Sequence, residues 1–154
     1  MAKSYSDKKV ESYLGFCWDE DPFSRTLYSD KSGDIAAIGG VNNLANAIFR
    51  RLKTPLGWYP EFPWYGCRMN EMIGMGNTYE NRELISEWIQ ESLLYEKRII
   101  DGTLNISVTR DAADYRAVRI LITCRIINFA SPNVFVYDFF LKTGDLNQVG
   151  VSVT

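Results

Sequence analysis

The chain has 154 residues, a length that suits one folded domain able to bury about 70% of the surface that its unfolded form exposes. Its 17 Lys and Arg residues against 19 Asp and Glu residues give a net charge of −2, which argues against a general binder of nucleic acid backbones. It has no histidine, which excludes a histidine-based catalytic triad, and its three cysteines (Cys17, Cys67 and Cys124) are widely spaced. Neither a disulfide framework nor a zinc site is indicated, and reduced thiols in a cytoplasm are the simpler interpretation.

Residues 1–13 are polar and lack periodicity, so we expect an N-terminal arm followed by a single domain over residues 14–154. The arm has no apolar core of the signal-peptide type, and no stretch of the sequence approaches the length of a membrane span. We therefore expect synthesis in a cytoplasm.

An amphipathic helix is the strongest local pattern. Apolar side chains recur at helical spacing from Val41 to Leu52, and Pro55 disfavours helical geometry at the residue before it, so the helix should end at about Lys53. Basic side chains in its last turn, Arg50, Arg51 and Lys53, suit the negative end of the helix dipole. The segment that follows, Thr54 to Gly66, is predicted to be irregular, with aromatic side chains anchored against the core: Trp58, Tyr59, Phe62, Trp64 and Tyr65.

Two further helices are predicted before the pattern changes. Met69 to Met75 favours a short helix, and Asn77 or Thr78 can cap a longer one. The apolar face of the longer helix consists of Leu84, Ile85, Trp88, Ile89 and Leu93.

In the second half of the chain, apolar and polar side chains alternate along the sequence and no longer follow helical spacing. Leu104–Val108 and Val118–Ile126 are predicted to form a hairpin, and runs at Asn133–Leu141 and Gln148–Val153 predict two more strands. The expected fold class is α+β, with two main helices and a short one packed on an antiparallel sheet that comes mostly from the C-terminal half, a mixed sheet being the alternative.

A series of short motifs follows a fixed order over roughly residues 14–128. Gly15-Phe16 and Pro22-Phe23 come first, then Gly33-Asp34-Ile35-Ala36, Thr54-Pro55-Leu56-Gly57, Tyr65-Gly66, and Tyr95-Glu96-Lys97-Arg98-Ile99. In this order they resemble the baseplate wedge, or sheath-initiator, proteins of contractile-tailed phages, which have relatives in type VI secretion and other contractile injection machines. Glu96 and Arg98 match a Glu-Pro-Arg signature of that family, whereas Lys97 stands where the family has proline and removes its restraint on the chain.

The resemblance implies a structural subunit and not an enzyme, with no catalytic residue, cofactor or metal. Its implied partners are the baseplate wedge core and the tail sheath, with tail tube or hub proteins as neighbours, and no nucleic acid or membrane. Several copies would surround the tail axis in the virion baseplate after assembly in the host cytoplasm. Because this family contacts sheath by strand exchange, residues 133–154 are expected to pair with a partner. The expected interface residues are Glu96, Arg98, Val134, Phe135, Val136, Tyr137, Phe139 and Leu141.

Three alternatives stay open. The run Val134 to Leu141 is apolar on both faces, which fits a covered central strand as well as it fits an interface. A cell-wall muramidase, a label given to relatives of this family, would need two carboxylates across a cleft; acids such as Glu61, Glu71, Glu80 and Glu83 are available, although solvated surfaces explain them more simply. The third alternative is the equivalent subunit of a bacterial contractile secretion system.

Overall fold

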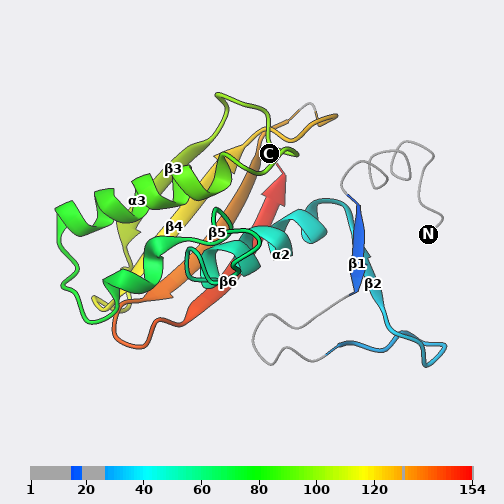
Figure 1. Cartoon of the computed structure of the whole chain (residues 1–154), viewed down its shortest axis with the longest axis horizontal. Coiled ribbons are helices and arrows are strands. Elements are labelled where there is room, and N and C mark those ends of the chain that lie inside the picture. The colour runs from blue at the N-terminus through cyan, green and yellow to red at the C-terminus, as the bar shows by residue number, and fades with distance from the viewer. Residues whose placement is uncertain (1–14, 19–26, 130, 154) are drawn as a thin grey trace.

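The computed structural model describes residues 15–18, 27–129 and 131–153. The arm predicted at residues 1–13 lies outside these ranges, as does the Pro22-Phe23 motif. The first described element is a small antiparallel sheet of β1 (Phe16–Trp18) and β2 (Ala37–Gly39). This sheet lies to one side of the main body and leads directly into the first described helix (Figure 1).

The main body is a four-stranded antiparallel sheet with the helices packed on one face (Figure 1). The strands lie side by side in chain order: β3 (Asn105–Arg110), β4 (Ala117–Cys124), β5 (Asn133–Phe140) and β6 (Leu146–Val153). The α+β fold is therefore confirmed, and the main sheet is antiparallel throughout rather than mixed.

The helices begin and end close to where the sequence predicts. α2 (Gly40–Lys53) follows β2, and α3 (Tyr79–Leu93) is capped by Thr78, whose hydroxyl accepts a hydrogen bond from the Asn81 N–H at 3.2 Å. The short helix expected between them is a 3-10 helix, η1 (Arg68–Met72). Local spacing thus predicts these elements, and a side-chain cap adds to it at α3 alone among the three.

Strand alternation directs one set of side chains under the helices. Phe135 and Tyr137 of β5 are fully buried beside Ile120 and Ile122 of β4. The Tyr137 hydroxyl donates a hydrogen bond of 3.0 Å to the carbonyl of Ala45, which ties the middle of the sheet to α2. Burial raises the pKa of Tyr137 above its ordinary value, so this hydroxyl stays a donor.

The two edges of the main sheet differ. β5 pairs with β4 on one side and β6 on the other, so both of its backbone edges are occupied. At β3, the Ser86 hydroxyl of α3 donates to the Ile106 carbonyl at 3.4 Å, and α3 packs along the strand. Among the described strands, β3 pairs only with β4 and β6 only with β5, so both are edge strands. α2 packs against β6, and a bulge beside Val136 and Tyr137 leaves Val149 of β6 exposed.

None of the helices within the described residues is both long enough and apolar enough to cross a membrane.

Candidate functional site

The loop between α2 and η1 is a closed unit. The Cys67 N–H donates to the Thr54 carbonyl at 2.8 Å, and the Leu56 N–H donates to the Cys67 carbonyl at 3.2 Å, so the two ends of the loop meet in a neck. Gly66 lies in this neck with φ of +115°, and a Cβ there would come within 2.6 Å of the carbonyl oxygens of Thr54 and Pro55. Glycine is therefore required at this position for the neck to close.

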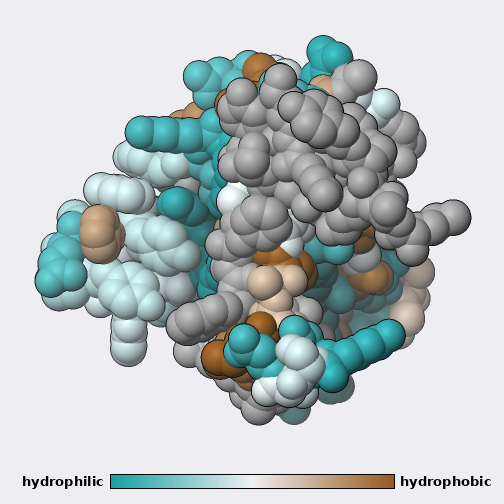
Figure 2. Space-filling model, turned by 90° about the vertical axis from the view of Figure 1, so that its right-hand side faces the viewer, coloured by the Kyte–Doolittle hydropathy of each residue, from teal (hydrophilic) through white to brown (hydrophobic). Residues whose placement is uncertain are grey.

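Four of the five aromatic side chains of this loop are exposed and Tyr65 is half-buried, so the prediction that they anchor in the core is wrong for those four. Trp58 is 67% exposed and Phe62 51%, and the loop forms the group of pale, near-neutral residues seen in profile at the left of Figure 2. The rings pack on one another instead, with Phe62 edge-on to Trp64 and Tyr59 edge-on to Tyr65, both at 5.8 Å between ring centroids. Because the neck closes the loop on itself, its rings contact each other rather than the sheet.

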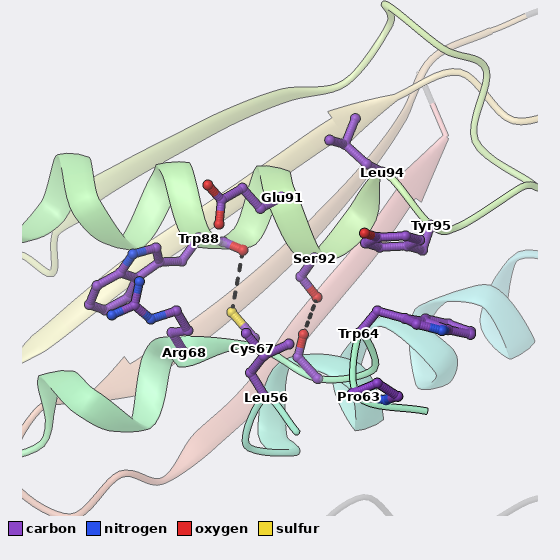
Figure 3. A pocket seen from close by; sticks show the side chains of 11 residues that line it. Leu56, Pro63, Trp64, Cys67, Arg68, Trp88, Glu91, Ser92, Leu94 and Tyr95 are labelled. Atoms are coloured by element: carbon purple, nitrogen blue, oxygen red, sulfur yellow. Dashed lines mark hydrogen bonds between the residues drawn. The ribbon is translucent and has the colours of Figure 1, made fainter. Parts of the chain in front are cut away.

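A groove of about 300 Å³ runs between this loop and α3 (Figure 3). At one end, the Arg68 guanidinium lies over the ring of Trp88, 4.7 Å from its centroid. At the other end, Trp64 stacks on Tyr95 with 5.3 Å between ring centroids. The remaining apolar lining comes from Leu56, Pro63 and Leu94.

Hydrogen bonds within the chain satisfy the polar groups between these two ends. The Ser92 hydroxyl donates to the Gly66 carbonyl at 2.7 Å, and the Cys67 thiol donates to the Trp88 carbonyl at 3.6 Å (Figure 3). Burial raises the pKa of the Cys67 thiol to about 11, so this sulfur is an inert part of the groove wall and no nucleophile. The Ser92 hydroxyl and the Cys67 thiol are thus already hydrogen-bonded within the chain.

The rim of the groove is acidic. Arg68 is already neutralised by Glu71, whose two carboxylate oxygens it contacts at 2.9 Å each, and these hydrogen bonds lower the pKa of Glu71. Glu91 also lines the groove, and in the described part of the chain no Lys or Arg pairs with it. Further acids lie exposed along α3 at helical spacing: Glu80, Glu83 and Glu87.

A buried cation lies beneath the loop. Arg51 is 7% exposed; its guanidinium is 4.6 Å from the centroid of the Tyr65 ring and donates to the Ser92 carbonyl at 3.4 Å. It therefore satisfies a carbonyl in the last turn of α3 and not only the dipole of its own helix. Sequence spacing did not single out this role, because it follows from how two helices meet.

Glu96 and Arg98 come together directly after the groove residue Tyr95. Their side chains form two hydrogen bonds of 2.6 and 2.8 Å, and the Glu96 side chain is 11% exposed. Burial alone would raise the pKa of Glu96, but the hydrogen bonds and charge of Arg98, with the charge of Arg51, lower it below its ordinary value. Lys97 between them is exposed, and the pair forms without a proline there.

The other predicted interface residues lie in the core or on the face of β5 that points away from it. Phe135, Tyr137, Phe139 and Leu141 are buried, and Val134 and Val136 are half-buried on the opposite side of β5. The structure does not bring them into the groove, and none lies on an open strand edge, since β5 is a central strand. Their role in an interface stays a prediction.

Among the described residues, no group of three or more Cys, Asp or Glu side chains is arranged to hold a metal ion.

Comparisons with protein families and with curated proteins give no match. Among solved structures, a Geobacter sulfurreducens protein provisionally named a tail lysozyme matches with a TM-score of 0.57 and 24% identity, over 68% of this chain and 94% of that one. A chain of the anti-feeding prophage (AFP) baseplate, a 6-fold symmetrised assembly, matches with a TM-score of 0.62 and 22% identity, over 79% of this chain and 93% of that one. The chain thus has the α+β fold of these two proteins.

Proposed function

We propose that this protein is a structural subunit of the baseplate of a contractile tail or a related injection machine. The observation that carries the proposal is the shared fold, which spans nearly all of a chain of the AFP baseplate. The ordered motifs of the sequence support the same class, and the groove supports a contact function because its polar groups are satisfied and its thiol is inert. A subunit of this kind would bind the wedge core and start the sheath.

We place the proposed strand pairing with sheath on β6. β5 has two partners already, whereas the outer edge of β6 pairs with no other described strand and offers free backbone donors and acceptors. The predicted pairing region, residues 133–154, contains both β5 and β6, and of these two only β6 lies at an edge of the sheet, where it can accept another strand. Removing residues 133–154 would delete half of that sheet, so a deletion is a poor test.

Site-specific photo-crosslinking tests the edge in assembled particles. A photoreactive residue replaces the exposed Val149 of β6 in one variant and the exposed Thr109 of β3 in a matched control. We expect Val149 to crosslink to the sheath protein and Thr109 to give no sheath adduct, because α3 packs along β3. Sheath adducts from Thr109 and not from Val149 would contradict strand pairing at β6, and no adduct with any tail protein from either position would contradict the baseplate assignment.

We further propose that the protein is not a muramidase. A general acid for glycoside cleavage needs a raised pKa, whereas hydrogen bonds lower the pKa of both Glu71 and Glu80. Glu61 and Glu83 are exposed, as are those two acids. Purified protein should leave the turbidity of a peptidoglycan suspension unchanged; clearing that is lost on a carboxylate substitution would overturn this part of the proposal.

A further inference from the structure

We propose that the groove between the loop of residues 54–67 and α3 is a docking site for an arginine-bearing apolar segment of another protein. This surface is separate from the β6 edge, and the inference stands whether or not β6 pairs with sheath. It rests on the shape of the groove, its apolar lining and the charge at its rim.

The apolar lining is exposed although the groove is formed by rigid parts. Trp64 is 43% exposed and Tyr95 54%, yet each is fixed by stacking on the other. The neck of the loop and the Ser92–Gly66 hydrogen bond hold the wall opposite α3 in place. Exposed aromatic side chains on a preformed surface bind at low entropic cost, and such residues dominate the energetics of protein interfaces.

The inner surface of the groove favours an apolar side chain. The Ser92 hydroxyl and the Cys67 thiol already donate to carbonyls of the chain itself, so an apolar group seated there leaves neither donor unpaired. Leu56, Pro63 and Leu94 supply the surrounding contact. A volume of about 300 Å³ matches a side chain or two of a peptide rather than an extended ligand.

The negative charge at the groove favours an arginine in the bound segment of the partner protein. The one cation of the lining, Arg68, is hydrogen-bonded to Glu71 and also interacts with the charge of Glu91, so the two carboxylates leave one negative charge in excess at the groove. A guanidinium can bind a carboxylate with two hydrogen bonds and pack its plane on an aromatic ring, whereas an ammonium cannot do the first. Glu91 lies among Trp88, Leu94 and Tyr95, so one short segment of the chain supplies both a carboxylate and aromatic rings for a guanidinium.

A carbohydrate would also use aromatic side chains, but the stacking argues against it. One face of Tyr95 is covered by Trp64, and Arg68 covers one face of Trp88, so flat faces for sugar rings are reduced. The excess negative charge at the groove gives no advantage to a neutral sugar. A protein segment is therefore the occupant that the groove favours.

Nuclear magnetic resonance of the tryptophan indoles in the full chain tests the proposal. The sequence has four tryptophans, so single substitutions assign each indole N–H signal. The probe is an acetylated peptide of about 10 residues that alternates leucine and arginine, and its matched control has glutamate at every arginine position. We expect the arginine peptide to shift the Trp64 and Trp88 signals and to leave Trp58, which does not line the groove, unchanged.

Two variants of α3 distinguish binding to the groove carboxylate from general attraction to the negative charge of this helix. Glu91→Gln should weaken binding of the arginine peptide about tenfold, whereas Glu83→Gln, which changes an exposed acid outside the groove, should weaken it no more than about twofold. Circular dichroism checks that both variants fold.

The proposal is overturned if the glutamate peptide binds as well as the arginine peptide, if neither shifts Trp64 or Trp88 at about 1 mM, or if both variants weaken binding equally. It is also overturned if an N-acetylglucosamine trisaccharide shifts these signals and the arginine peptide does not.

Discussion

Replacing Gly66 with alanine should destabilise the protein far more than the same change at another glycine of the loop. A Cβ at position 66 would lie 2.6 Å from the carbonyl oxygens of Thr54 and Pro55 and 2.8 Å from the carbonyl carbon of Pro55. These neighbours are backbone atoms, so a side-chain movement cannot relieve the contact. The neck of the loop has to open.

The size of the effect follows from what the neck holds. Forcing alanine to positive φ costs about 1 kcal/mol, and opening the neck loses two backbone hydrogen bonds of about 1 kcal/mol each. The total of about 3 kcal/mol corresponds to a Tm lower by about 6–12 °C in a chain of this length. Since Gly66 also accepts from Ser92, the variant should lose peptide binding in the groove as well.

Gly57 supplies the matched control. It lies in the same loop with φ of +75°, but nothing is within 4 Å of the position that a Cβ would take. Gly57→Ala should therefore cost only about 1 kcal/mol and lower the Tm by about 2–4 °C. Scanning calorimetry measures both variants. Equal losses of stability at positions 57 and 66 would show that the close approach in the neck does not constrain the chain, and would refute the reasoning.

Two further predictions concern buried ionisable groups. Glu96→Gln should lower the free energy of unfolding by about 1 kcal/mol at about pH 7. Because the folded-state pKa of Glu96 lies below its ordinary value of 4.5, this stabilisation is complete above the unfolded-state pKa and is lost as the pH falls through the folded-state pKa. Urea titrations should thus show wild type and variant converging on acidification, and a gap that widens would contradict the assignment. Burial raises the pKa of Cys67 and of Cys124 to about 11, so iodoacetamide at about pH 8 should label neither in the folded protein and both in urea. Rapid labelling of Cys67 in the folded protein, located by peptide mass mapping, would be inconsistent with a closed groove wall.

Local patterns in the sequence predict most of the fold. Helical spacing gives α2, the cap at Thr78 gives the start of α3, and alternation of apolar and polar residues gives the four strands of the main sheet. These features depend on neighbours a few residues apart, which a sequence displays directly.

Features that depend on distant contacts could not be predicted in the same way. Alternation shows that β5 has two apolar faces but not that β4 and β6 occupy both of its edges. Apolar composition suggests that Trp58 and Phe62 enter the core, whereas the neck at Gly66 holds them outside. From the sequence, Arg51 is expected to face solvent, whereas in the structure it donates to a carbonyl of α3. In each case, contacts between distant segments determine whether the residue is buried, exposed or paired, and residue type alone does not.

The bulge in β6 determines which strands the open edge can accept. Gly150 pairs with Val136 and Gln148 with Tyr137, so Val149 is one extra residue in β6. A flat strand in register with residues 150–153 would be one residue out of register with residues 146–148, and its side chains would switch faces. The edge therefore selects a partner with a matching irregularity, or one that uses only half of β6. Chance edge-to-edge growth between free copies is suppressed by the same extra residue.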